Sequence, residues 1–150
     1  MVHNETNGRD PTMKTRTPRA LTALLLGLAM LAPAAQAAPD ASGIWLTETG
    51  DSKVRLSRCG SGMCGTIVST SGKGIDENNP NPALRTRSVV GVQIVNATTP
   101  TADGYEGTLY NPKDGKTYSG SLKVTGPNTV EVAGCVMSVF CKRQTWKRVN

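Results

Sequence analysis

Apolar positions in this chain follow two different patterns. Residues 20–32 are almost continuously apolar, interrupted only by Thr22 and Gly27. After Ala37, apolar and β-branched residues come in short runs separated by Gly, Pro, Asn and Asp. No window in this second region keeps apolar residues at the i, i+3, i+4, i+7 spacing of an amphipathic helix, so the pattern predicts β-strands.

The short runs predict a series of strands. Apolar and polar residues alternate most clearly over residues 90–94, 118–124 and 130–132, as expected for strands with one buried face. Gly120 interrupts the second of these and marks a bulge or a close approach of two backbones. The expected strands are 43–49, 53–59, 65–69, 88–96, 105–110, 117–125, 129–134 and 140–148.

The connections between these strands are short and rich in turn-forming residues, as at 60–62 and 126–128. Neighbouring strands should therefore pair antiparallel in a meander. About eight strands must hide their edges, and closing into a small barrel does this most simply, with a sandwich as the competing arrangement. The longest unpatterned stretch, residues 70–87, should be a surface loop across one mouth of the barrel.

The apolar segment before Ala37 has the three parts of a secretory signal peptide. Basic residues precede the apolar run, and Ala35-Gln36-Ala37 supplies a small-x-small cleavage pattern. The run is shorter than the roughly 20 residues of a spanning helix. We therefore expect a periplasmic or secreted protein. The expected organisation is a dispensable extension at 1–12 before a start at Met13, a signal peptide at 13–37 and one β-barrel domain at 38–150.

The composition after this leader excludes several kinds of chemistry. The only histidine, His3, lies before the leader, so a processed chain has no Ser-His or Cys-His nucleophile and no histidine metal ligand. About 110 residues remain, enough for one domain with one modest core. Basic residues are spread from Lys53 to Arg148 without a long run, and no cysteine lies at the cleavage point to be lipidated. We expect neither a nucleic-acid partner nor a membrane anchor.

All four cysteines, Cys59, Cys64, Cys135 and Cys141, follow the leader and allow three pairings. Each neighbouring pair flanks an expected turn, which brings Cα atoms within the roughly 4.4–6.8 Å that a disulfide needs. We expect Cys59–Cys64 and Cys135–Cys141 bridges, each contributing less than about 3 kcal/mol because the loops are short. A zinc site of four thiolates is the alternative, disfavoured by the spacings and by an oxidising compartment.

Residues 76–81, Asp-Glu-Asn-Asn-Pro-Asn, form the densest cluster of oxygen ligands in the chain. Calcium binding is one interpretation. The EF-hand pattern fails, however, with Asn81 in place of the required Gly and Arg87 in place of the bidentate Glu. A loop of Asx-turns stiffened by proline is the favoured interpretation, and we expect no metal or other cofactor.

Residues 110–118 predict a hairpin with a polar tip. Either its side chains lie beside a ligand, or Asp114 and Gly115 make the turn while Tyr110 and Tyr118 form a cross-strand aromatic pair. Asp76 and Asp114 are also candidates for an acid–base pair, because glycosidases work with two carboxylates. Nothing in the sequence brings these two carboxylates together, so we assign no catalytic residue and expect binding in preference to catalysis.

Motifs spread over almost the whole chain after the leader resemble one family. They are Gly43-Ile44-Trp45, Gly65-Thr66-Ile67, Asp76-x-x-Asn79-Pro80, Gly107-x-x-Tyr110-Asn111-Pro112-x-Asp114-Gly115-Lys116-x-Tyr118, Gly134-Cys135 and Cys141-x-x-Gln144-x-Trp146-x-Arg148. Together they are similar to the bacterial exported family catalogued as domain of unknown function 2147. The resemblance implies a small lipocalin-like β-barrel with Gly-x-Trp on its first strand and an Arg near its last. It implies no activity, ligand or catalytic residue.

The expected fold is therefore all-β, a small antiparallel up-and-down barrel of about eight strands. Its first and last strands should be neighbours, with Gly43 and Trp45 facing Trp146 and Arg148. We expect the Arg148 guanidinium to cover the Trp45 indole, with Arg143 as the second candidate.

The favoured function is binding of a small apolar or amphipathic molecule at the barrel mouth. Alternatives are a protein-interaction or inhibitor module of the cell envelope, and a histidine-free hydrolase. Alanine at Asp76, Arg85, Asn111 or Asp114 should weaken binding and leave thermal stability nearly unchanged. The candidate ligand-binding residues are Asp76, Asn79, Arg85, Tyr110, Asn111, Asp114 and Tyr118.

Overall fold

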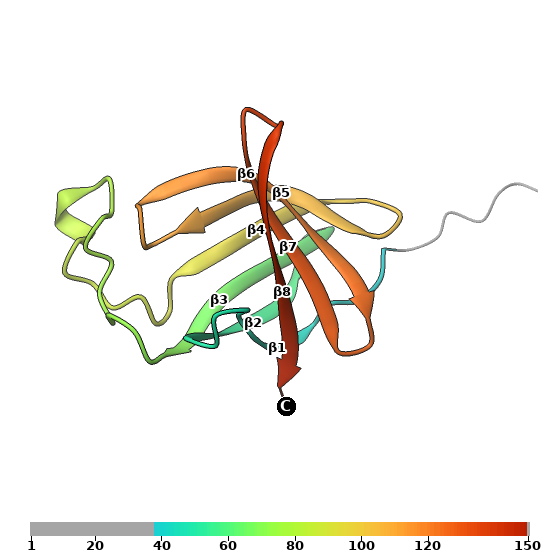
Figure 1. Cartoon of the computed structure of the whole chain (residues 1–150), viewed down its shortest axis with the longest axis horizontal. Helices are drawn as coiled ribbons and strands as arrows, with labels where there is room; N and C mark the ends of the chain where they lie inside the picture. Colours follow the sequence, from blue (N-terminus) through green and yellow to red (C-terminus); the bar gives the residue numbers. More distant parts are fainter. Residues whose placement is uncertain (1–37, 150) are drawn as a thin grey trace, which may run out of the picture. The chain divides into compact units, whose positions relative to one another are not determined.

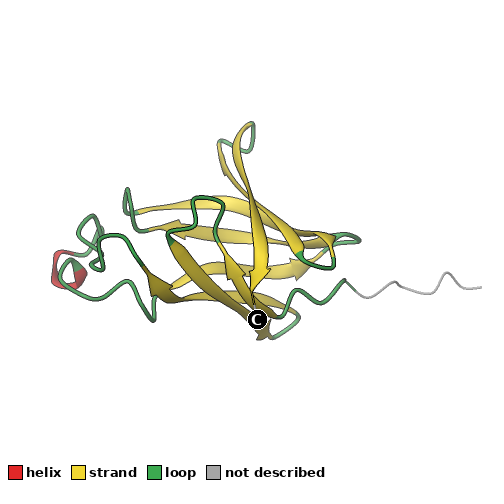
Figure 2. Ribbon diagram, turned by 60° about the horizontal axis from the view of Figure 1, so that its bottom comes forward, coloured by secondary structure: helices red, strands yellow, loops and turns green. Residues whose placement is uncertain are grey.

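Eight antiparallel strands close into a barrel in the computed structural model, which describes residues 38–149 (Figure 1). The expected extension and signal peptide lie outside the described residues. A single short 3-10 helix, η1 (Pro82–Leu84), lies within the described part, in the long loop after β3 (Figure 2). The strands are β1 (Gly43–Leu46), β2 (Ser52–Cys59), β3 (Gly62–Thr70), β4 (Gln93–Pro100), β5 (Gly104–Asn111), β6 (Lys116–Gly126), β7 (Thr129–Val136) and β8 (Phe140–Val149).

The topology is an up-and-down meander closed by its two end strands. Each strand pairs with the next in sequence, and β1 also pairs with β8, with Trp45 opposite Arg148. Short turns force each strand back beside its predecessor, and closure then leaves no unpaired sheet edge. The predicted up-and-down barrel is confirmed, and the sandwich is wrong.

The start of β4 is the largest error among the expected strands. The sequence places a strand at 88–96, whereas β4 is Gln93–Pro100. Gly91 has a φ of +93°, and the Val92 N–H bonds to the Val89 carbonyl in a turn. The apparent alternation at 90–94 therefore spans a turn, because Val89 and Val92 are buried beneath the loop and Val90 is exposed.

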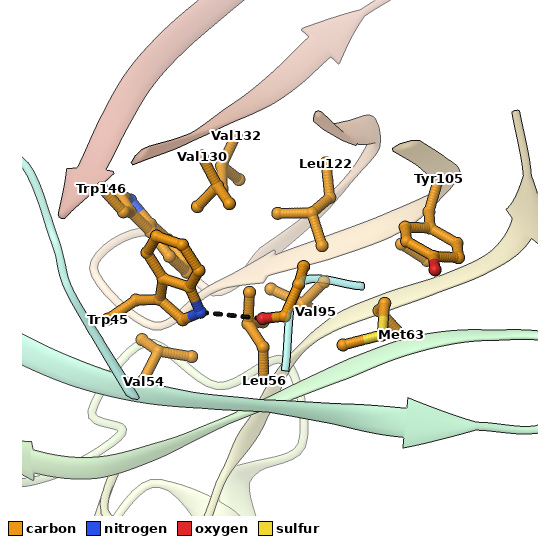
Figure 3. Close-up of a cluster of buried hydrophobic side chains, with 12 residues drawn as sticks. Trp45, Val54, Leu56, Met63, Val95, Tyr105, Leu122, Val130, Val132 and Trp146 are labelled. Atoms are coloured by element: carbon orange, nitrogen blue, oxygen red, sulfur yellow. Dashed lines mark hydrogen bonds between the residues drawn. The ribbon is translucent and has the colours of Figure 1, made fainter. Parts of the chain in front are cut away.

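Large side chains fill one end of the barrel, which we call the closed end (Figure 3). The N-terminal segment 38–42 lies across this end. Two of its carbonyls accept hydrogen bonds from buried side chains. The Trp45 indole N–H donates to the Ala41 carbonyl at 2.9 Å, and the Tyr105 hydroxyl donates to the Pro39 carbonyl at 3.0 Å. These bonds satisfy polar groups that burial would otherwise leave unpaired. The fully buried residues of this core are Ala41, Trp45, Val54, Leu56, Met63, Val95, Ala97, Tyr105, Leu122 and Val130.

Arg148 closes the barrel over Trp45, as the sequence predicts. Its guanidinium carbon lies 4.3 Å from the centroid of the indole ring. The same guanidinium donates to the carbonyls of Ser42, at 2.7 Å, and Pro127, at 3.1 Å. Gly43 makes room for it, because any Cβ at this position would overlap the Arg148 Nη1 atom. The Gly-x-Trp motif and the distant arginine therefore form one contact.

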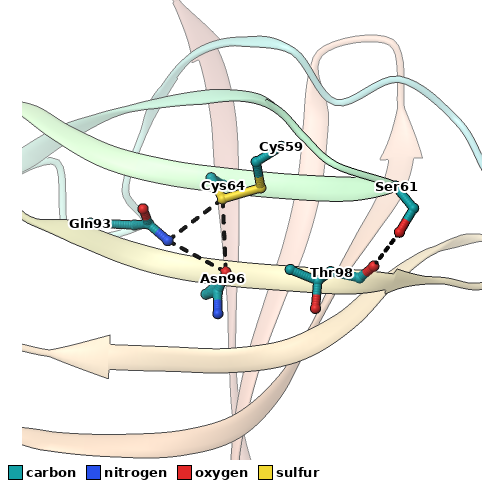
Figure 4. The surroundings of a disulfide bond; sticks show 6 residues. All are labelled: Cys59, Ser61, Cys64, Gln93, Asn96 and Thr98. Atoms are coloured by element: carbon teal, nitrogen blue, oxygen red, sulfur yellow. Dashed lines mark hydrogen bonds between the residues drawn. A yellow bond between two sulfur atoms is a disulfide. The ribbon is translucent and has the colours of Figure 1, made fainter.

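Both expected disulfides are present. Cys59–Cys64 joins the ends of β2 and β3, with a Cα–Cα distance of 5.7 Å (Figure 4). Cys135–Cys141 joins directly opposed residues of β7 and β8. All four sulfurs are used, so no thiolate is left to bind zinc. The bridges indicate an oxidising, exported environment for the barrel.

Candidate functional site: a cavity at the open end

The other end of the barrel holds an open-mouthed cavity of about 630 Å³. Three hairpin turns surround this open end, at residues 47–51, 112–115 and 137–139, together with the long loop at 71–92. Its floor is made by Val95, Val132 and Trp146, which also belong to the buried core. The cavity therefore continues the core outward and is not a separate surface pocket.

The size of the inward-facing residues changes along the strands. Gly107, Gly120 and Gly134 are direct partners across β5, β6 and β7, so one row of three neighbouring strands adds no side chain to the interior. At Gly120 a Cβ would overlap the Ala133 carbonyl and the Leu109 side chain, so the predicted close approach occurs here. Gly134 differs, because a Cβ there would make only ordinary contacts and would point at the cavity.

The cavity has an apolar wall and a polar rim. Ile67, Ile94 and Leu109 line the wall between the floor and the mouth. Polar groups on the opposite strands are already hydrogen-bonded in part. The Tyr118 hydroxyl donates to Asp114 at 2.6 Å, and Gln144 accepts from the Trp146 indole N–H at 3.0 Å. Three lysines, Lys73, Lys113 and Lys142, complete the rim. An amphipathic molecule matches this gradient better than a wholly polar one.

A buried carboxylate fixes the long loop at the mouth. Asp76 is fully buried and accepts from the Tyr110 hydroxyl at 2.6 Å, the Asn79 amide at 2.7 Å and the Arg87 guanidinium at 2.7 Å. Its backbone N–H also bonds to the Arg87 carbonyl, which closes the base of the loop. Burial alone would raise the pKa of Asp76, but these three donors outweigh it and hold the pKa below its usual value. Asp76 therefore stays ionised and structural.

An ion pair crosses the rim between two hairpins. Lys113 of the β5–β6 turn lies 2.7 Å from Asp51 of the β1–β2 turn. The hydrogen bond from Lys113 is the main reason that the pKa of Asp51 falls to about 2. The Lys113 carbonyl accepts from the Asn78 side chain at 2.9 Å, which ties the long loop to the same hairpin. Gly115, with a φ of +69°, permits this approach because a Cβ would overlap the Asn78 carbonyl.

The structure divides the candidate ligand-binding residues into two groups. Tyr110, Asn111, Asp114 and Tyr118 line the cavity. The remaining residues, Asp76, Asn79 and Arg85, do not line it, and each bonds within the long loop.

The tyrosines of the β5–β6 hairpin do not form the cross-strand pair offered as one interpretation. Tyr110 is opposite Thr117 and Tyr118 is opposite Leu109, one row apart. Residues in successive rows start from opposite faces of a sheet, so Tyr110 and Tyr118 are not direct cross-strand partners, although both line the cavity. Each hydroxyl instead donates to its own carboxylate, Asp76 or Asp114.

Sequence reasoning missed the part of the site contributed by β8. Lys142, Gln144 and Trp146 alternate along this strand and all line the cavity. The period of two was present in the sequence, but polar residues at the first two positions concealed an inward face.

Asp114 and Asp76 do not have the raised pKa of a general acid. Burial would raise the pKa of Asp114, but the Tyr118 hydroxyl and the Lys116 backbone N–H outweigh it, so the pKa is lowered. The pKa of Asp76 is lowered in the same way, and Asp76 bonds to partners other than those of Asp114.

Within residues 38–149, no group of three or more His, Cys, Asp or Glu side chains is placed to hold a metal ion. The same residues include no helix long and apolar enough to span a bilayer.

Comparisons with known proteins agree with this architecture. A family model described as "Uncharacterized protein conserved in bacteria (DUF2147)" matches residues 43–148. Among solved structures, the chain is similar to protein HP1028 from Helicobacter pylori, described as belonging to the lipocalin family. The two are 26% identical over 74% of this chain and 84% of that chain, with a TM-score of 0.64. Curated proteins give no match. The chain therefore belongs to the bacterial family of domain of unknown function 2147, with the barrel of a lipocalin-like protein.

Proposed function

We propose that this protein binds a small apolar or amphipathic molecule in the cavity at the open end of the barrel. The observation that carries the proposal is the cavity itself, about 630 Å³ beside a closed end that is filled with side chains. This volume lies within the roughly 300–1,000 Å³ of small-molecule sites. The lipocalin-like barrel of the similar H. pylori protein supports the same class of function.

The lining gives the ligand an orientation. Its apolar part lies against Leu109, Ile67 and the indole of Trp146, where removal of apolar surface from water drives binding. Its polar end lies at the rim beside the Tyr118 hydroxyl. We place the protein in the periplasm or outside the cell, because its disulfides need an oxidising compartment.

Fluorescence of Trp146 offers a direct test. Trp146 lines the cavity, whereas Trp45 lies in the closed end and does not. A dibrominated stearate bound in the cavity should therefore quench the tryptophan emission of the protein, chiefly through Trp146. Native mass spectrometry of protein purified from its own cell envelope should show a co-purifying small molecule.

A cavity-filling variant sharpens this test. Gly134→Val puts a β-branched side chain into the cavity at a position where a Cβ has room. We expect the affinity for the brominated stearate to fall about tenfold or more with the fold intact, because branched carbons replace the space for part of the chain. Gly134→Ala is the matched control and should change affinity much less. Equal quenching in the wild-type and Gly134→Val proteins would contradict the proposal.

A further inference from the structure

The β7–β8 hairpin carries the most exposed large apolar side chains among the described residues. Met137 is 83% exposed, Val139 and Phe140 are each 73% exposed, and Val136 is 50% exposed. The hairpin projects from the barrel wall in both views (Figures 1 and 2). Single exposed apolar residues are ordinary, but four together at a projecting tip mark an interaction site.

The backbone of this tip is one that apolar residues seldom adopt. Met137 and Ser138 have φ values of 53° and 58°, and the Val139 N–H bonds to the Val136 carbonyl. This is the geometry of a type I′ turn, which favours Asn-Gly at its two central positions. The Cys135–Cys141 bridge one rung below the Val136–Phe140 pair holds the two strands together. The turn itself therefore does not explain why a methionine is present at its first central position.

The charge of the hairpin restricts what it can contact. Residues 135–143 include Lys142 and Arg143 and no acidic residue. Arg143 pairs with Glu131 at 2.7 Å, whereas Lys142 is exposed and lies on the cavity rim. An apolar tip with a lysine behind it matches the order of layers in an anionic bilayer, with acyl chains inside and phosphates outside.

We propose that the tip of the β7–β8 hairpin, Val136–Phe140, inserts into the interface of an anionic lipid bilayer while Lys142 faces the lipid phosphates. A protein partner fits less well, because stable protein interfaces bury about 800 Å² on each side and need complementary shape, which a narrow convex tip does not offer. Val136 and Phe140 also line the cavity, so insertion brings its mouth to the membrane surface. The contact does not depend on what the cavity holds.

Cosedimentation with vesicles tests the proposal, using protein purified from its own envelope with the processing that the cell gives it. The wild-type protein should bind anionic vesicles made of an equal mixture of phosphatidylcholine and phosphatidylglycerol. It should bind vesicles of phosphatidylcholine alone more weakly. Met137→Asn and Phe140→Ser should each lower the partition coefficient about fivefold to tenfold, since each removes a large apolar side chain from the contact. Lys142→Gln should lower it about fivefold on the anionic vesicles only.

Three controls separate this contact from folding, from exposed apolar residues elsewhere and from the cavity. Asn suits the left-handed turn better than Met does, so Met137→Asn should unfold at the same or a higher temperature. Val90→Ser removes an apolar side chain that is 45% exposed from the long loop and should leave vesicle binding unchanged. Gly134→Val should also leave it unchanged, even though it blocks the cavity.

Three results would overturn the proposal. The first is a wild-type protein that does not sediment with anionic vesicles. The second is equal sedimentation of the wild-type, Met137→Asn and Phe140→Ser proteins. The third is loss of vesicle binding in Gly134→Val with the hairpin intact, which would assign the membrane contact to the cavity. If vesicles do not bind and cross-linking from position 137 captures a single envelope protein, the tip is a protein-docking site instead.

Discussion

At the closed end of the barrel, Trp45, Tyr105 and Leu122 are fully buried, whereas at the open end the same sheet encloses a cavity of about 630 Å³. The buried polar atoms named at the closed end are an indole N–H and a hydroxyl, each bonded to a backbone carbonyl. The open end is held by charged groups, Asp76 with Arg87 and Asp51 with Lys113. One end is stabilised by burial and the other by polar contacts around the cavity.

This difference shows how one small sheet can carry both a core and a site. Strands in a barrel point every second residue inward, so the interior is set by residue size row by row. The rows with Trp45 and Tyr105 fill the barrel, and the row of Gly107, Gly120 and Gly134 does not. Polar contacts must then hold the loops at the mouth, because side chains there lack the packing contacts that a filled core provides.

The comparison predicts its largest effect at the closed end. Trp45→Ala should lower the free energy of unfolding by about 3–5 kcal/mol, because it leaves a large cavity in a filled core. Leu109→Ala at the open end should lower the free energy of unfolding about half as much, since Leu109 is half-buried and lines the cavity. Denaturant unfolding followed by circular dichroism measures both. Equal losses would show that the two ends are equally packed.

The second prediction concerns the carboxylate that fixes the long loop. Asp76→Asn puts an amide among donors and should destabilise the loop by about 1–3 kcal/mol, because the Asn79 amide and the Arg87 guanidinium lose an ionised acceptor. Native-state hydrogen exchange at the Asp76 and Val89 amides measures this local stability. The neighbouring Glu77→Gln is the control, since Glu77 pairs only at the surface with Lys73.

This expectation corrects the one drawn from sequence alone, in which alanine at Asp76 weakens binding without affecting stability. The structure shows Asp76 fully buried with three side-chain partners. Protection that is unchanged in Asp76→Asn would return the residue to the group of binding candidates.

Sequence reasoning succeeded where the physics is local or set by the chain's two ends. Short turns predicted the meander, and cysteines flanking turns predicted the bridges. The contact of Arg148 with Trp45 followed because closure must bring the first and last strands together. These features need only neighbouring residues or one topological fact.

It failed where the outcome depends on which side chains meet across the fold. The role of Asp76 depends on Tyr110, on a strand that follows much later in the chain. Val89 and Val92 resemble strand residues because both are buried. The positive φ of Gly91 between them shows that the chain turns there and does not continue as a strand. Whether the barrel is hollow depends on the summed volume of residues from every strand, which no single window of sequence contains.

The third prediction breaks the closure at the closed end. Arg148→Lys should lower the free energy of unfolding by about 0.5–2 kcal/mol, because an ammonium cannot cover the Trp45 indole and donate to both Ser42 and Pro127. Near-ultraviolet circular dichroism should report the altered setting of the indole. Lys147→Arg, one residue away on the same strand, serves as a control and should change neither signal. An unchanged free energy of unfolding in Arg148→Lys would show that the strand pairing alone closes the barrel.

The smallest expected effect is at the rim of the open end. Lys113→Gln should lower the free energy of unfolding by at most about 1 kcal/mol near neutral pH, because the pair with Asp51 is exposed on the lysine side and screened by salt.

The clearer signature of Lys113→Gln is the pH dependence of its stability. The pKa of Asp51 is about 2 in the fold against an ordinary value of 3.8, so the carboxylate contributes stability that is complete above about pH 4 and is lost as the pH falls towards 2. Removing the lysine removes the main cause of that shift, so the loss of stability between pH 4 and pH 2 should become shallower. Urea unfolding across this range measures the slope, and Asp51→Asn should flatten it to the same degree or further. An unaltered slope in both variants would show that other carboxylates with a lowered pKa, such as Asp76 and Asp114, dominate the acid sensitivity of the barrel.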